Sequence, residues 1–115
     1  MMRQIRHPLV RRDVIGLFNH ILETTRGDLA AAERRLDEID GLLDSIAGNP
    51  ASGIRLDGKL AGWRARPRAR HGGRGQMITV VFRADLGAGL VYIAMIAFGG
   101  RNWLEDAAER RSFPG

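Results

Sequence analysis

The residues best suited to chemistry are arginines that alternate along one short segment. From Trp63 onward every second residue is Arg, and Ala, Pro and Ala occupy the positions between them. A period of two predicts a β-strand with all four guanidinium groups on one face. Paired N–H donors let Arg bind carboxylates and phosphates, so the row predicts an acidic partner, either protein or nucleic acid. The alternative is a solvated edge strand whose charges deter strand pairing. The Arg row consists of Arg64, Arg66, Arg68 and Arg70.

Further cations extend this basic region. Arg74, Arg83 and Arg101 also belong to the second half of the chain, and residues 61–83 contain no Asp or Glu. With a pKa above about 12, Arg stabilises a phosphate well but is a poor general base at neutral pH. His71 is the one nearby side chain that titrates close to neutrality, although a solvated histidine in a Gly-rich turn is the simpler interpretation. The basic surface is therefore better suited to binding than to proton transfer.

The composition narrows the remaining function classes. The chain has 115 residues and a formal net charge of +5, which predicts one domain over residues 1–115. The absence of Cys excludes a disulfide scaffold, a Cys-zinc site and a thiol nucleophile, and the three His lack metal-ligand spacing. We therefore predict no metal and no cofactor. The N-terminus lacks a signal-peptide pattern and the longest apolar run is too short for a membrane span, so we expect a cytoplasmic protein without membrane contact.

Hydrophobic periodicity predicts two long helices in the first half. Apolar residues recur at spacings of three and four between Pro8 and Thr25, and again after Asp28, which can cap the second helix. Gly48, Asn49 and Pro50 end that helix. The short connection predicts an antiparallel helical hairpin.

The second half changes to a strand pattern. We expect three consecutive strands in an antiparallel meander, with Pro67 marking an edge, and a last helix capped by Asn102. The hairpin should cover one face of the sheet, and Trp63 should pack beneath the hairpin. The Arg row should lie on the other face of the sheet. Trp103 should anchor the last helix. The fold class is α+β: an N-terminal strand and the helical hairpin packed on a small, mainly antiparallel sheet, with a short C-terminal helix. The predicted strands are 2–6, 63–70, 77–83 and 90–98, the helices are 8–25, 28–48 and 103–111, and the loop and turns are 51–59, 71–75 and 85–89.

Over roughly residues 3–111, this order of elements and several local patterns resemble the RelE/ParE superfamily of bacterial toxins. The match in order and spacing is carried by the first-helix segment 13–21, the Asn-Pro-x-x-Gly element 49–53, Leu-x-Gly and Gly-Trp-Arg at 56–58 and 62–64, and Phe-Arg-x-Asp at 82–85. The resemblance implies the toxin of a type II toxin–antitoxin system. It also implies a cognate antitoxin as partner, in a possible toxin–antitoxin hetero-oligomer.

The superfamily contains two activities. RelE-like members cleave mRNA on the ribosome, and Arg64, Arg66 and Arg101 fall on three of their basic positions. Thr79 stands at a further basic position, however, and residues 103–106 lack the expected Tyr. ParE-like members inhibit DNA gyrase by binding, which needs no proton-transfer set. The resemblance therefore implies a ParE-like, non-enzymatic gyrase inhibitor, with a ribosome-dependent mRNA endonuclease or a nucleic-acid-binding module as alternatives. The residues assigned to partner or target binding are Arg64, Arg66, Arg68, Arg70, Arg74, Arg83 and Arg101.

Overall fold

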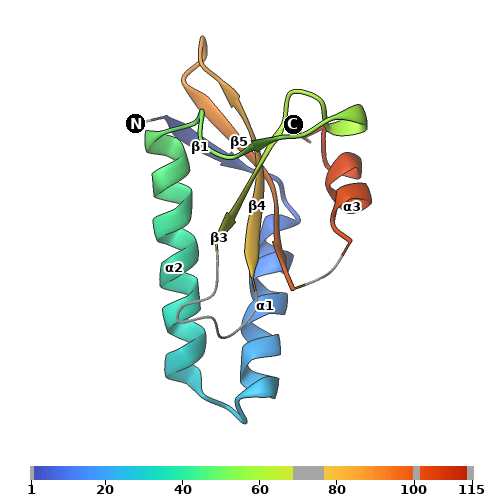
Figure 1. Cartoon of the computed structure of the whole chain (residues 1–115). Coiled ribbons are helices and arrows are strands. Elements are labelled where there is room, and N and C mark those ends of the chain that lie inside the picture. Colours follow the sequence, from blue (N-terminus) through green and yellow to red (C-terminus); the bar gives the residue numbers. More distant parts are fainter. Residues whose placement is uncertain (1, 69–76, 100–101, 114–115) are drawn as a thin grey trace.

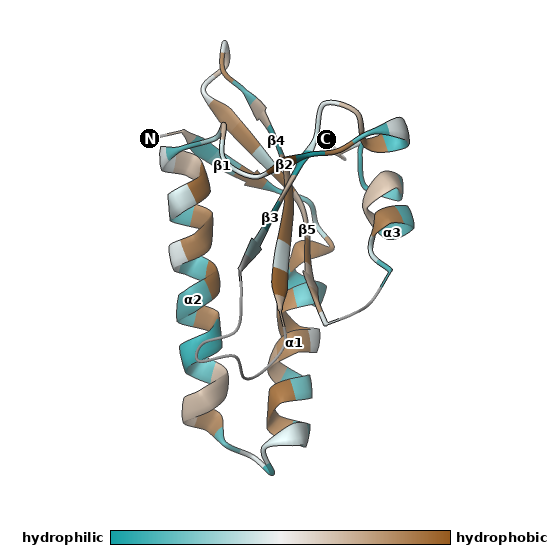
Figure 2. Cartoon of the chain, in the orientation of Figure 1, coloured by the Kyte–Doolittle hydropathy of each residue, from teal (hydrophilic) through white to brown (hydrophobic). Residues whose placement is uncertain are grey.

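The nearly continuous apolar segment β5 (Leu90–Phe98) lies inside the sheet, between β1 and β4 (Figure 2). The computed structural model describes residues 2–68, 77–99 and 102–113. In this part of the chain the strands are ordered β1-β5-β4-β3-β2, with β1 parallel to β5 and the other pairs antiparallel. The other strands are β1 (Arg3–Arg6), β2 (Ile54–Arg55), β3 (Arg64–Arg68) and β4 (Ile78–Asp85). The α+β class and the antiparallel meander are confirmed.

The two long helices, α1 (Val10–Thr24) and α2 (Leu29–Gly48), form the predicted hairpin (Figure 1). Asp28 caps α2, because its Oδ1 accepts the N–H of Ala31 at 3.0 Å. The turn between the helices contains Arg26 and Gly27, which both have positive φ, of 56° and 88°. α1 begins at Val10, two residues after the predicted start, and the N–H of Leu9 is bonded to a side chain instead.

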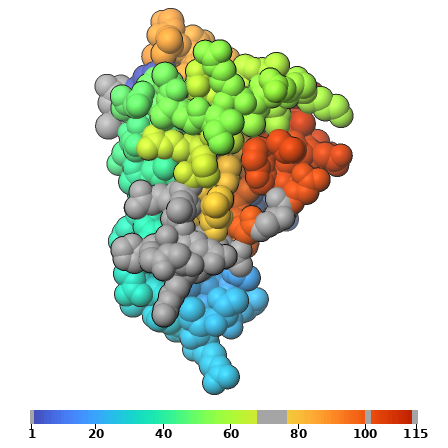
Figure 3. All heavy atoms as spheres, in the orientation of Figure 1, coloured from blue at the N-terminus to red at the C-terminus, as the bar shows by residue number. Residues whose placement is uncertain are grey.

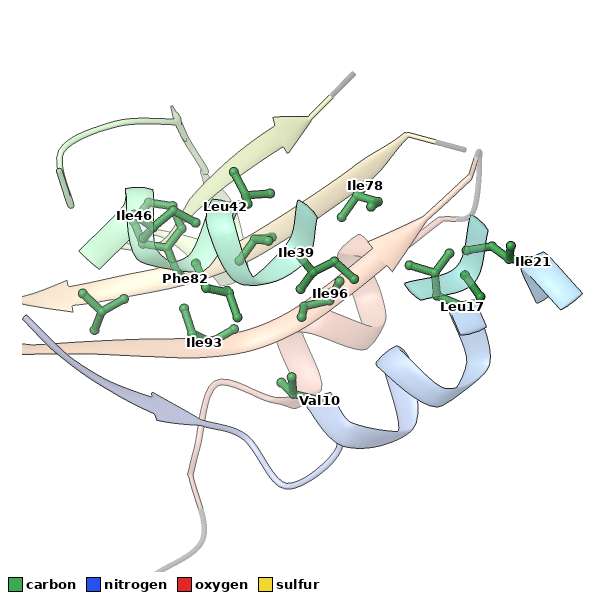
Figure 4. Close-up of a cluster of buried hydrophobic side chains, with 14 residues drawn as sticks. Val10, Leu17, Ile21, Ile39, Leu42, Ile46, Ile78, Phe82, Ile93 and Ile96 are labelled. Atoms are coloured by element: carbon green, nitrogen blue, oxygen red, sulfur yellow. The ribbon is translucent and has the colours of Figure 1, made fainter. Parts of the chain in front are cut away.

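The hairpin packs on one face of the sheet and buries a single apolar cluster (Figure 4). Leu17 from α1 and Ile46 from α2 are fully buried in this cluster, as are Phe82 of β4 and Ile93 of β5. Removing such side chains from water is the main stabilising term of the fold. The buried members of this cluster are Val10, Leu17, Ile21, Ala32, Ile39, Leu42, Leu43, Ile46, Ile78, Val80, Phe82, Val91, Ile93 and Ile96.

The opposite face of the sheet carries a second, smaller cluster. Leu60 of the 3-10 helix η1 (Gly58–Leu60) and Ala107 of α3 (Leu104–Glu109) cover Met95 there. Trp63 belongs to this cluster, so the prediction that it packs beneath the hairpin is wrong. Trp103 packs against the same cluster and anchors α3, as predicted. Asn102 does not cap α3; the N-cap position is Trp103, which makes no side-chain capping bond.

Two elements occupy the segment predicted as a loop. β2 pairs with Arg64 and Ala65 of β3, and η1 follows it. β2 is therefore the outer strand, and Pro67 lies on the part of β3 that β2 does not reach. This position fits a residue without an N–H to donate, as the edge prediction required.

Candidate functional site

The register of β3 places the start of the Arg row on the helical side of the sheet. Arg64 lies opposite Phe82 and Arg66 opposite Val80. Directly opposed residues of antiparallel strands project from the same face, and both partners belong to the cluster beneath the hairpin. The prediction that the row occupies the face away from the hairpin is therefore wrong for these two residues.

Arg66 is tied to the chain that leaves α2. Its Nη1 donates to Ser52 Oγ at 2.7 Å, and both side chains are partly buried. This bond fixes one guanidinium group beside the helical hairpin. The backbone of Arg68 pairs with Ile78, so its strand assignment is confirmed. Three other assigned residues, Arg70, Arg74 and Arg101, lie outside the described residues, as do His71 and the rest of the predicted turn 71–75.

Arg83 lies on the other face of the sheet, apart from Arg64 and Arg66. Its guanidinium carbon is 4.6 Å from the centre of the Tyr92 ring and 5.6 Å from that of Trp63. These distances are those of cation–π contacts, which hold the charge over the aromatic rings. The structure thus places Arg83 on one face of the sheet and Arg64 and Arg66 on the other, so these three members of the predicted basic surface do not lie together.

Phe113 completes an aromatic cluster around this contact. Its ring lies edge-on to Tyr92 and to His7, with centroid distances of 5.2 and 5.3 Å, and stacks on Trp63 at 6.2 Å. The C-terminal segment thus covers the sheet face that carries Arg83. The sequence contains no signal for this arrangement, because Phe113 is an isolated aromatic residue beyond the last predicted helix.

His7 is a buried member of the same cluster. Its Nδ1 accepts the N–H of Leu9 at 3.1 Å, so the nitrogen that faces the backbone carries no proton. Burial lowers the pKa of His7, the positive charge of Arg110 lowers it further, and Asp13 partly offsets both. His7 is therefore neutral near pH 7. Its side chain accepts a backbone N–H in the connection between β1 and α1.

An ion pair between the first and last helical segments lies next to His7. Asp13 of α1 accepts from Arg110 through both oxygens, with Oδ2–Nη1 at 2.6 Å and Oδ1–Nη2 at 3.0 Å. Oδ2 also accepts the N–H of Ile96 at 3.0 Å, and Nη1 donates to the carbonyl of Ala94 at 3.2 Å.

β1 pairs with β5 only as far as Ile93, and the ladder between β4 and β5 is irregular at Val81 and Phe82. The Asp13–Arg110 pair satisfies backbone groups of β5 beyond the end of β1. No local pattern in the sequence indicates this pair, because Asp13 and Arg110 lie near opposite ends of the chain.

Among the described residues, the side chains able to transfer protons do not lie beside Arg64 and Arg66. Tyr92 is beneath Arg83 on the other face, His7 is buried, and the His20 ring lies 5.5 Å from that of Phe98. Within the described ranges, no group of three His, Asp or Glu could hold a metal ion. None of the described helices is long and apolar enough to cross a bilayer. In the described part of the chain, the groups that Arg64 and Arg66 offer to solvent are partly buried guanidinium cations.

Arg55 adds a cation to this surface that sequence analysis did not assign. It is exposed on β2 and lies directly opposite Arg64 across the β2–β3 pair. The two arginines line one depression of about 290 Å³ together with Leu56, Asp57, Gly62 and Trp63. A strand of two residues is too short to show alternation, so the sequence predicts a loop at Arg55.

Comparison of the chain with protein-family models, with curated proteins and with solved structures finds no match.

Proposed function

We propose that this chain is the toxin of a type II toxin–antitoxin system, that it inhibits DNA gyrase by binding, and that a cognate antitoxin neutralises it. The proposal rests on the resemblance to ParE-like toxins given by the sequence. The element order supports it, because a strand, a helical hairpin, an antiparallel meander and a terminal helix follow one another as the resemblance implies.

One observation favours a binder over a nuclease. Arg64 and Arg66 project from the helical side of the sheet, whereas Tyr92 lies under Arg83 on the other side. Cleavage by the 2′-hydroxyl of RNA needs a proton acceptor close to the group that stabilises the phosphate. Inhibition by binding needs only complementary shape and charge.

The test combines expression in bacteria with a reaction of purified components. We expect expression to arrest DNA synthesis before protein synthesis, and the purified chain to inhibit supercoiling of relaxed plasmid by gyrase. Co-expression of the gene adjacent to that of the toxin should restore growth.

Different results would favour the alternatives. Protein synthesis that stops first, with mRNA cut in the presence of ribosomes, would support the endonuclease, and toxicity should then require Arg64, Arg66 and Arg101. Unaffected supercoiling and translation, with salt-sensitive binding to DNA or RNA, would leave the nucleic-acid-binding module.

A further inference from the structure

Two like charges face each other at the outer edge of the sheet. Arg55 of β2 and Arg64 of β3 are a directly opposed pair, and such positions bring side chains close together on one face. Among the described residues, neither guanidinium group makes a hydrogen bond or an ion pair. By contrast, Arg66 is bonded to Ser52 and Arg110 to Asp13. A like-charged cross-strand pair is destabilising unless an anion lies between its members.

The surroundings of this pair form a small recess. Gly62, with φ of 91°, turns the chain so that Trp63 and the two arginines line the same depression. In Figure 3 the light-green segment that precedes β3 lies on the visible surface of the molecule. Asp57 also lines the recess. Its carboxylate adds negative charge and so disfavours a dense polyanion such as a nucleic-acid backbone, whereas a single carboxylate can still be held between two arginines.

The neighbouring residue Ile54 points to a polypeptide as the source of that carboxylate. It is 62% exposed on the outer strand. Because successive strand residues project to opposite faces, Ile54 lies on the face away from Arg55, and an extended chain that runs along this edge would contact both residues. Protein interfaces combine apolar contacts of this kind with Arg, whereas nucleic-acid contacts are dominated by phosphate.

We propose that Arg55 and Arg64 bind a carboxylate of an acidic polypeptide segment that docks at the β2 edge against Ile54. This inference rests on the proposed function, because the proposed function supplies the protein partner to which the acidic segment would belong.

The test uses the purified full-length chain and fluorescein-labelled hexaglutamate, with binding measured by fluorescence anisotropy at low salt. Arg55→Gln and Arg64→Gln should each weaken binding about tenfold or more, because each removes one arm of the carboxylate clamp. Asp57→Asn should strengthen binding a few fold by removing a like charge. Arg34→Gln, an exposed charge change on α2, is the matched control and should alter affinity by less than about twofold.

Unchanged affinity in Arg55→Gln and Arg64→Gln would overturn the proposal. So would an equal loss in Arg34→Gln, which would indicate attraction by net charge alone. A labelled thymidine hexanucleotide that binds more tightly than hexaglutamate, through the same two arginines, would assign the site to nucleic acid and also overturn it.

Thermal unfolding provides a second readout that does not need a ligand. Relief of the like-charge pair should leave the Tm of Arg55→Gln at low salt equal to or above that of the unsubstituted chain, and a lower Tm would contradict the repulsion on which the site is argued. Neither measurement involves gyrase. A chain that binds hexaglutamate but leaves supercoiling unaffected would refute the proposed target alone, whereas gyrase inhibition without this binding would refute the site alone.

Discussion

The Asp13–Arg110 pair allows a sharp prediction about stability. The two side chains are 7% and 11% exposed, and Asp13 bonds to both Arg110 and the N–H of Ile96. Arg110→Ala would leave a buried carboxylate without its counter-charge, and such a change lowers the free energy of unfolding by about 3–5 kcal/mol. A domain of this size has roughly 5–15 kcal/mol in total, so this one substitution should remove a large fraction of its stability.

Urea denaturation followed by tryptophan fluorescence measures this loss. Arg111→Ala is the matched control: Arg111 is exposed and donates to the carbonyls of Lys59 and Ala108, so we expect a loss of only about 1 kcal/mol. The double substitution Asp13→Ala with Arg110→Ala should cost less than the sum of the single ones, because no unpaired charge is then left buried. A loss below about 1 kcal/mol in Arg110→Ala, or additive effects, would refute the reasoning.

Three further predictions concern His7, a turn glycine and the C-terminal tail. Folding lowers the pKa of His7 below 6.5, so the unfolded state takes up a proton first and the free energy of unfolding should fall as the pH drops below that value. His7→Asn keeps an acceptor for the N–H of Leu9 and should lose this part of the pH dependence, at most about 1.4 kcal/mol per pH unit; equal slopes in urea titrations of both proteins would contradict it. Gly53→Ala should destabilise by about 2 kcal/mol, whereas Gly41→Ala should not. At Gly53 φ is 100° and a Cβ would lie 2.9 Å from a backbone oxygen, while a Cβ at Gly41 meets nothing within 4 Å; equal Tm values for the two variants would refute this. Phe113→Ala removes three ring contacts and should cost about 2 kcal/mol in urea denaturation, and an unchanged midpoint would show that the tail is not held by its ring.

The sequence predicts most of the fold because its signals there are local. The stripes of α1 and α2 repeat over several turns, and the side chain of Asp28 caps α2 as its position before an apolar run indicates. β4 and β5 are rich in β-branched and apolar residues and are joined by a tight turn, which Asp85 stabilises by accepting the N–H of Ala88 at 3.1 Å. The single Pro of β3 lies where the sheet has a free edge.

The site was harder to predict because it depends on which face each strand presents. Alternation shows that Arg64 and Arg66 share one face and Trp63 the other, but it does not say which face meets the hairpin. That choice is made by the register with β4, where Arg64 lies opposite Phe82. The pair of Asp13 with Arg110 spans 97 positions, and no local pattern in the sequence reports a contact over that distance.

The parallel pairing of β1 with β5 has a consequence for how the chain is made. Arg3 lies opposite Leu90, so β1 has no neighbouring strand until β5 has been synthesised. Until then the apolar stripe of the hairpin has no complete sheet to cover, and the nascent chain exposes apolar surface that can bind chaperones or aggregate. Contacts this distant in sequence slow folding. Completion of the sheet therefore waits for β5, and the basic edge formed by β2 and β3 belongs to a finished sheet no earlier than that.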